Sequence, residues 1–194
     1  MSAQLKIETY ITYEEYVIIE NASPIKHEYF QGQLYAMAGA SQKHNDLCMS
    51  VGSSLKTQLR GKSCKPRQSD QRVRVEKSDL STYPDVVVIC PPEKYSDKDG
   101  IAATDATVIV EVLSKSTAKY DRGSKFEFYK QLESFRHYVL VAQEEINVEH
   151  RFLNAQGEWE TEVFTSLDDS FRLETINCAL NVGEIYEDIE MVSV

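Results

Sequence analysis

The stretch Thr107-Val-Ile-Val-Glu-Val-Leu113 is an apolar run that carries a single charged residue, Glu111. A short apolar run rich in β-branched residues is typical of a strand that is buried on both faces. A buried carboxylate that is neither paired with a cation nor bound to a metal destabilises the folded chain by several kcal/mol. The run therefore predicts a strand inside the fold whose Glu111 side chain meets a cation.

A second acid stands at the start of another apolar run, Asp85-Val-Val-Val-Ile-Cys90, directly after Pro84. If the two strands are neighbours joined by a loop over residues 91–105, Asp85 and Glu111 lie at the same edge of the sheet. Two carboxylates about 4 Å apart repel by roughly 4 kcal/mol at an effective dielectric of 20, so they need a cation, a shared proton or a lysine. Taken alone, Asp85 also fits a turn cap after Pro84, and Glu111 a cross-strand salt bridge.

Lys125 is the candidate ammonium for this pair of acids. It lies in a helix predicted over residues 116–134 and shares the apolar stripe of Tyr129, four residues further on. From this position the ammonium reaches back over the end of the Glu111 strand. The alternative is an i,i+4 pair with Asp121, in which the lysine stem extends toward solvent.

Two further candidates come earlier in the chain. Glu28 lies in a β-hairpin predicted over residues 27–37, and His44 lies in the first turn of a helix predicted from Ser41 to Gly61. Glu28 equally fits an exposed strand residue, and His44 a group that satisfies the helix terminus. Neither residue identifies a site by itself.

The remaining pattern predicts an α/β fold of the α+β kind, with a mixed central sheet flanked by helices. The capping box Thr12-Tyr-Glu-Glu15 opens an N-terminal helix that ends near Asn21. The strand at 107–113 is followed by a helix and by a strand over 137–142, which is the crossover of a mixed sheet. Further elements are expected as strands over 62–66, 69–76, 84–90, 146–153 and 159–164, and as a short helix near Asn181.

Length and composition suit one domain over residues 1–194. No run approaches the roughly 18 apolar residues of a membrane span, and the N-terminus lacks the pattern of a signal peptide, so we expect a cytoplasmic protein without membrane contact. The four cysteines form no C-x-x-C pair, so neither a disulfide framework nor a zinc knuckle is expected. The sequence around Ser114 lacks nucleophile-elbow glycines, which argues against serine-hydrolase chemistry.

Charge is distributed unevenly along the chain. The net charge of −10 argues against a general basic coat for nucleic acid. Residues 56–77 nevertheless hold eight Lys/Arg against two acids, a net charge of +6, whereas residues 144–194 hold thirteen acids against two arginines, a net charge of −11. The basic segment is either a solvated face or a surface that contacts phosphates. The candidate nucleic-acid contacts are Arg67, Arg72, Arg74 and, on the loop after the Glu111 strand, Lys115.

Together these residues resemble a known family. The ordered motifs are Glu28-Tyr-Phe-Gln-Gly32, Met37-Ala-Gly39, Ser41-x-x-His44, Pro84-Asp85, Glu111-Val-Leu-Ser-Lys-Ser-Thr117, Asp121, Lys125 and Tyr129. This combination looks like the Uma-two family of restriction-endonuclease-like proteins of bacteria, which belongs to the PD-(D/E)XK nuclease superfamily, and the resemblance covers roughly residues 10–190. It implies a restriction-endonuclease-like core in which Asp85 and Glu111 are metal ligands.

One position departs from the superfamily pattern. The lysine expected two residues after the acid is Leu113 in this chain. Lys125 would replace it from the helix, as the family's own motif suggests, and Lys115 on the loop is the other substitute.

The resulting hypothesis is a Mg²⁺- or Mn²⁺-dependent endonuclease that hydrolyses phosphodiester bonds of nucleic acid, with DNA as the expected substrate. Asp85, Glu111 and the backbone carbonyl of Val112 would bind the metal, and Lys125 would orient or deprotonate the attacking water.

Two further residues complete the expected catalytic set. Glu28 would hold a second metal or a water, and His44 is the fifth residue of the expected catalytic set. A homodimer is expected for an enzyme that cuts both strands. The alternative is a catalytically inactive nuclease-like module that binds nucleic acid or another partner.

Overall fold

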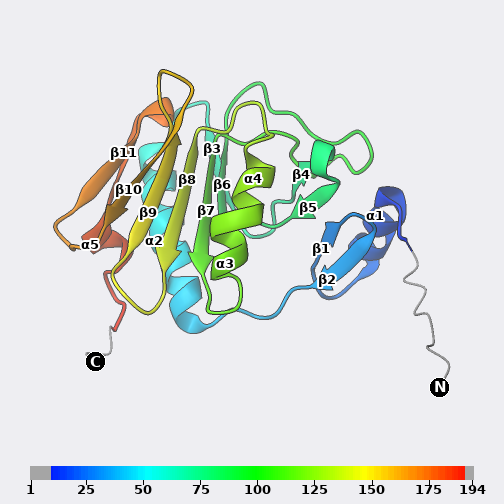
Figure 1. Cartoon of the computed structure of the whole chain (residues 1–194), viewed down its shortest axis with the longest axis horizontal. Coiled ribbons are helices and arrows are strands. Elements are labelled where there is room, and N and C mark those ends of the chain that lie inside the picture. Colours follow the sequence, from blue (N-terminus) through cyan, green and yellow to red (C-terminus); the bar gives the residue numbers. More distant parts are fainter. Residues whose placement is uncertain (1–9, 191–194) are drawn as a thin grey trace.

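A six-stranded mixed sheet forms the centre of the computed structural model, which describes residues 10–190 (Figure 1). Its strand order is β10-β9-β8-β7-β6-β3, with β7 and β8 parallel and the other neighbours antiparallel. The strands are β3 (Lys65–Gln68), β6 (Val86–Ile89), β7 (Val108–Leu113), β8 (His137–Ala142), β9 (Val148–Leu153) and β10 (Trp159–Phe164). The prediction of a mixed sheet is confirmed, and the apolar run that holds Glu111 is the inner strand β7.

The parallel pair β7–β8 requires a crossover, and this crossover is helical. It consists of α3 (Ala118–Tyr120), a π-helical segment (Asp121–Lys125) and α4 (Phe126–Tyr129). The helix predicted over 116–134 therefore ends earlier than expected. After Tyr129 the chain runs through turns, and Asp105 accepts hydrogen bonds from the backbone N–H and the hydroxyl of Ser134, at 2.8 and 2.5 Å.

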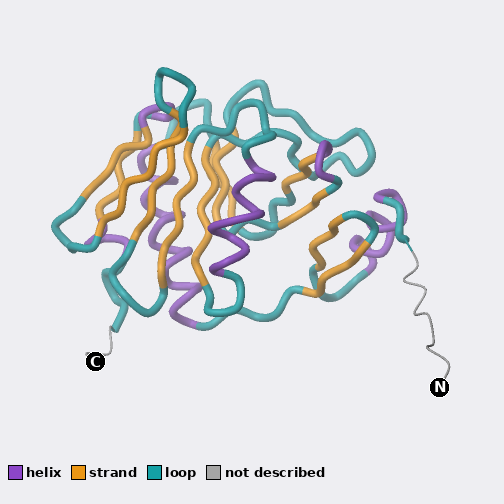
Figure 2. Tube along the Cα trace, viewed as in Figure 1, coloured by secondary structure: helices purple, strands orange, loops and turns teal. Residues whose placement is uncertain are grey.

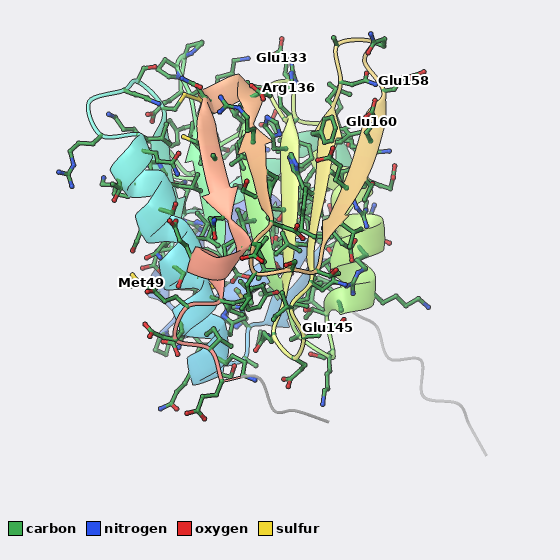
Figure 3. All side chains as sticks on the ribbon, turned by 90° about the vertical axis from the view of Figure 1, so that its left-hand side faces the viewer. Met49, Glu133, Arg136, Glu145, Glu158 and Glu160 are labelled. Carbon is green, nitrogen blue, oxygen red and sulfur yellow. A yellow bond between two sulfur atoms is a disulfide. The ribbon has the colours of Figure 1, made fainter. Side chains whose placement is uncertain are left out.

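Helices cover both faces of the sheet. On one face α2 (Gln42–Gln58) packs through Leu47, Val51 and Leu55, and on the opposite face α4 packs through Phe126 and Tyr129. Figure 3 shows these two helices on opposite sides of the strands, with Met49 on the outer flank of α2. The Ser41 hydroxyl accepts a hydrogen bond from the N–H of His44, which confirms the predicted start of α2.

A smaller layer precedes the central sheet in the chain. The predicted capping box at Thr12 is present and starts α1. Strand β5 was missed because its three residues follow a 3₁₀ turn and carry no alternating pattern. The elements of this layer are α1 (Tyr13–Ala22), β1 (His27–Phe30), β2 (Gln33–Ala36), β4 (Val73–Val75), a 3₁₀ turn (Glu76–Ser78) and β5 (Leu80–Thr82), with strand order β2-β1-β5-β4.

The C-terminal part adds a two-stranded sheet that the sequence analysis did not predict. Strands β11 and β12 pair with each other (Figure 2). Their buried side chains belong to the same core cluster as those of α2. Asn181 caps α5, as predicted, by accepting a hydrogen bond from Glu184 N. These elements are β11 (Ser170–Leu173), a 3₁₀ turn (Glu174–Ile176), β12 (Cys178–Asn181) and α5 (Val182–Ile185).

A disulfide joins Cys64 and Cys90, so the expectation that no disulfide forms was wrong. The two cysteines flank the antiparallel pair β3–β6, whose register sets Lys65 opposite Ile89. That register brings the cysteine Cα atoms to 4.1 Å. The pairing depends on which strands are neighbours, which cysteine spacing alone does not reveal. Within residues 10–190, no helix combines the length and the apolar character needed to cross a lipid bilayer.

Two stacked histidines are buried between β8, β9 and the C-terminal elements. His137 Nδ1 lies 3.0 Å from His150 Nε2, and the two side chains are 3% and 2% exposed. Burial lowers the pKa of His137 to about 4 and that of His150 to about 3. The charged groups nearest to them are Glu162, 4.0 Å from His150, and Glu174 and Arg136, whose effects on His137 oppose each other.

We predict that acid destabilises the fold through this pair. Because both folded-state pKa values lie below the ordinary value of 6.5, only the unfolded chain takes up protons as the pH falls from about 6.5 to about 4. The free energy of unfolding should therefore fall by about 1.4 kcal/mol per pH unit for each histidine. Urea unfolding across this range measures the slope, and His150→Gln should reduce it by about half of the histidine contribution. An unchanged slope in that variant would contradict the assignment.

Candidate active site

A buried ion pair between Glu111 and Lys125 lies at the centre of the candidate site. Glu111 is in β7, and strand alternation points its side chain to the face that α4 covers. Lys125 is the last residue of the π-helical segment, and its Nζ atom lies 2.8 Å from Glu111 Oε1. The two side chains are 6% and 7% exposed. The charge inside the apolar run is therefore met by a cation from the crossover.

Two further carboxylates approach the same ammonium. Asp121 Oδ1 and Glu28 Oε1 each lie 3.5 Å from Lys125 Nζ. The two arrangements considered for Lys125, a pair with Glu111 and an i,i+4 pair with Asp121, are thus present together. Asp121 and Lys125 are four residues apart in the π-helical segment, and both side chains meet at the strand end.

Hydroxyl groups complete the hydrogen bonds of this cluster. Tyr129 OH donates to Glu111 Oε1 at 2.9 Å, and Thr82 Oγ1 donates to Glu28 Oε1. Tyr129 comes from α4 and Thr82 from the last residue of β5. The small N-terminal sheet therefore positions Glu28 against the crossover.

Asp85 lies beside this cluster, immediately before β6. The register Val86↔Val110 sets Asp85 opposite Glu111 when it is continued by one residue. Asp85 Oδ2 accepts a hydrogen bond from Val112 N at 2.7 Å and lies 3.2 Å from His44 Nε2. The structure thus brings Asp85, Glu111, Val112, His44 and, through Lys125, Glu28 to one edge of the sheet.

Burial and neighbouring charges shift the pKa values of the groups in this acid-rich cluster. Burial, helped by Asp85 and Asp121 and opposed by Lys125, raises the pKa of Glu111 to about 8. Burial lowers the pKa of Lys125, but Glu111, Tyr129 and the other acids outweigh it and hold that pKa well above its ordinary value. The ammonium is therefore protonated at neutral pH, whereas burial favours the neutral form of the Glu111 and Asp121 carboxyl groups beside it.

The donor groups of this cluster are of the kind that bind a divalent cation. Glu28, Asp85, Glu111 and Asp121 together face one lysine and one histidine. Carboxylate and carbonyl oxygens are the ligands that Mg²⁺ and Mn²⁺ prefer. Asp85 and Glu111 are the two of these acids that stand opposite each other when the register of β6 and β7 is continued by one residue.

The N-terminal turn of α2 adds a thiol that the sequence analysis did not consider. Cys48 stands four residues after His44, and its Sγ atom lies 3.4 Å from His44 Nδ1. The hydrogen bond that His44 Nε2 donates to Asp85 Oδ2 is the largest influence, and it raises the pKa of His44 above its ordinary value. The spacing of His44 and Cys48 on one helix face was the signal that could have identified Cys48.

Gln143 is a second residue that sequence reasoning missed. Its Nε2 atom donates to the carbonyl of Leu113 at 2.8 Å, and its Oε1 atom accepts from Ser41 Oγ at 2.9 Å. The side chain therefore ties the start of α2 to the end of β7. It holds the helix that carries His44 against the strand that carries Glu111.

The structure contradicts the prediction that Arg72 and Arg74 contact nucleic acid, because both are buried, at 2% and 7% exposure. Arg74 pairs with Asp79 at 2.5 Å and stacks on Tyr13, 3.9 Å from the ring centroid. Arg72 similarly turns inward, where its Nη2 donates to Asn21 Oδ1 at 3.0 Å. These arginines fasten the N-terminal layer to the core.

The other two candidate nucleic-acid contacts lie at the surface. Arg67 is partly exposed and pairs with Glu93 at 2.8 Å, while Lys115 is exposed on the loop that follows β7. Lys115 is close in sequence to Glu111, and its side chain is free to reach a ligand at the strand end.

Comparison with known proteins places the chain among nuclease-like proteins. The family model described as "Uma2: Putative restriction endonuclease" matches residues 13–183. The protein slr1290 of Synechocystis sp., described as uncharacterized, is 32% identical over 176 residues, which is 91% of each chain. The protein sll1609 of the same organism, described in the same way, is 33% identical over 149 residues, or 77% of this chain and 84% of that protein.

A solved structure has the same fold. The crystal structure of "a putative nuclease belonging to DUF820" from Anabaena variabilis matches with a TM-score of 0.72 and 17% identity, covering 91% of this chain and 98% of that one. At this level of identity the likeness concerns the fold alone. It confirms the predicted nuclease-like α+β architecture.

We predict that Glu111 and Lys125 are energetically coupled. Lys125→Met leaves the buried Glu111 and Asp121 carboxylates without their cation, which should cost about 3–5 kcal/mol of stability. In a Glu111→Gln background the same change should cost less, with a coupling free energy of about 0.5–3 kcal/mol. Urea unfolding of the four proteins at about pH 9, above the raised pKa of Glu111, measures this cycle. Strictly additive effects would show that the pair does not interact.

Proposed function

Because the chain belongs to the Uma2 family of restriction-endonuclease-like proteins, we propose that it is a metal-dependent endonuclease that hydrolyses phosphodiester bonds of DNA. The observation that carries this proposal is the Lys125 Nζ atom held 2.8 Å from Glu111 Oε1, with Asp85 at the same sheet edge. Phosphoryl transfer is catalysed by positioning and by stabilising negative charge, and such a cluster offers both.

Asp85, Glu111 and the backbone carbonyl of Val112 would hold a Mg²⁺ or Mn²⁺ ion. When bound, the ion supplies Lewis-acid polarisation of the scissile phosphate and lowers the pKa of a water. Asp85 is held for this role by the hydrogen bond from Val112 N, which fixes one of its oxygens at the strand end. Glu28 would bind a second ion or a water, from the far side of Lys125.

Lys125 acts as a cationic donor in this mechanism. Its raised pKa keeps it protonated, so it suits orienting a water and stabilising charge at the phosphate more than removing a proton. Its position on the crossover supplies the ammonium that the superfamily pattern expects at residue 113. His44, with its raised pKa, would position Asp85 and contact the phosphate.

Lys115 and Arg67 would contact the nucleic-acid backbone from the loop after β7 and from the edge strand β3. A homodimer would place two such sites on the two strands of a duplex.

The test separates metal binding from cleavage. Glu111→Ala should abolish Mn²⁺ binding in calorimetry, because it removes a ligand. Lys125→Ala should retain Mn²⁺ but cleave a mixed panel of DNA and RNA substrates about 10²-fold more slowly, the scale of a lost charge stabiliser. Matched controls are Glu127→Ala and Lys130→Ala, a surface ion pair of α4 whose removal should change neither quantity.

Two results would contradict the proposal. Unimpaired Mn²⁺ binding by Glu111→Ala would remove the metal site, and unimpaired cleavage by Lys125→Ala would remove the lysine from the mechanism. Metal-independent nucleic-acid binding by a wild-type protein that cleaves no substrate would favour the inactive binding module instead.

Calcium should occupy the site without supporting turnover. Ca²⁺ accepts oxygen ligands in larger and less regular coordination than Mg²⁺, so it holds a water less strictly for in-line attack. Adding Ca²⁺ to a Mg²⁺-supported cleavage assay should inhibit competitively. Cleavage supported equally by Ca²⁺ alone would argue against this mechanism.

A further inference from the structure

A second group of potential metal ligands adjoins the acidic cluster. His44, Cys48 and Asp85 each offer a ligand atom, and these atoms all lie within 4.8 Å of one another. His44 Nε2 is 3.2 Å from Asp85 Oδ2, and Cys48 Sγ is 3.4 Å from His44 Nδ1. All three residues are partly buried, so the group is shielded but reachable.

The donor types differ from those of the proposed Mg²⁺ site. A thiolate, an imidazole and a carboxylate suit borderline ions such as Zn²⁺ and Co²⁺, whereas Mg²⁺ binds oxygen ligands. Three protein ligands with an open fourth position are a common zinc arrangement. At the usual zinc bond lengths, the ligand atoms of a tetrahedral site lie about 3.3–3.7 Å apart. The three donor atoms here lie within 4.8 Å of one another, so each separation has to shorten by at most about 1 Å.

We propose that His44, Cys48 and Asp85 form a binding site for a thiophilic divalent ion such as Zn²⁺. Helix α2 supplies two ligands from one face, and the turn before β6 supplies the third.

The surrounding contacts hold the three residues in place without any metal. Ser41 caps α2 through His44 N, and Gln143 ties Ser41 to the end of β7. Asp85 is fixed by Val112 N. The competing arrangement is a hydrogen-bonded trio in which His44 donates to Asp85 and interacts with the thiol, and the test below distinguishes the two.

Asp85 belongs to both proposed sites, so Zn²⁺ would compete with Mg²⁺ for this carboxylate. Zinc binding would therefore withdraw Asp85 from the Mg²⁺ site and inhibit cleavage. This inhibitory effect rests on the proposed nuclease function, whereas the binding of Zn²⁺ does not.

Cobalt spectroscopy tests the site directly. Co²⁺ added to the metal-free protein should give a thiolate-to-cobalt charge-transfer band, which Zn²⁺ then displaces. Cys48→Ser should abolish the band and weaken Zn²⁺ binding by more than about 100-fold, beyond what loss of an outer-shell partner costs. Cys178→Ser is the matched control, because Cys48 and Cys178 are the two free cysteines of the chain and Cys178 is buried in β12.

The outcomes either support or overturn the proposal. No band in the wild type, or a band that persists in Cys48→Ser, overturns it. If Cys48→Ser does not fold, alkylation of the wild type followed by mass spectrometry decides, since Zn²⁺ should protect Cys48 from the reagent, and equal labelling with and without Zn²⁺ overturns the site.

A further variant separates this proposal from the nuclease function. Glu111→Ala should retain the cobalt band and its displacement by Zn²⁺ although it loses Mn²⁺. Loss of the band in Glu111→Ala, which keeps all three proposed ligands, would overturn the site. A protein that binds Zn²⁺ through Cys48 but cleaves no nucleic acid would leave the zinc site standing and refute only the nuclease.

Discussion

The burial of Glu111 is the constraint on which the rest of the site depends. Strand β7 has a neighbour on each side and a helix over each face, so water cannot solvate this carboxylate. Its charge has to be met by side chains, and Lys125 and Tyr129 meet it from the crossover. The connection between β7 and β8 is thus a chemical part of the site as well as a topological link.

Two helices on opposite faces deliver different chemistry to the same strand ends. The crossover brings the carboxylate of Asp121 and the ammonium of Lys125. Helix α2 brings the imidazole of His44 and the thiol of Cys48. Asp85 lies between the two sets, because it precedes β6 next to the end of β7. The position of this one carboxylate explains why the acids around Lys125 and the His44–Cys48 pair come close together at a single sheet edge.

The parts of the fold and site that could be predicted share a local signal. Glu111 and Lys125 are charges inside apolar patterns, and Thr12, Ser41 and Asn181 are caps with clear spacing. What could not be predicted depends on long-range pairing. The disulfide, the strands β5, β11 and β12, and the bridge made by Gln143 follow from which elements are neighbours. Arg72 and Arg74 were misassigned because a count of charges does not reveal burial beneath tyrosines.

The π-helical winding of Asp121–Lys125 changes which kinds of sequence change the site tolerates. A lysine on a strand changes face with every residue, whereas each residue of an α-helix turns the side chain by about 100° and each residue of the wider π-helical turn by less. The reach of Lys125 to Glu111 is therefore set by the number of residues in the segment. Gly123 and Ser124 are exposed, and the space around Gly123 is open, so their identities are free to drift. We expect insertions and deletions in this segment to be poorly tolerated, because a single one would rotate the Lys125 ammonium away from the Glu111 carboxylate.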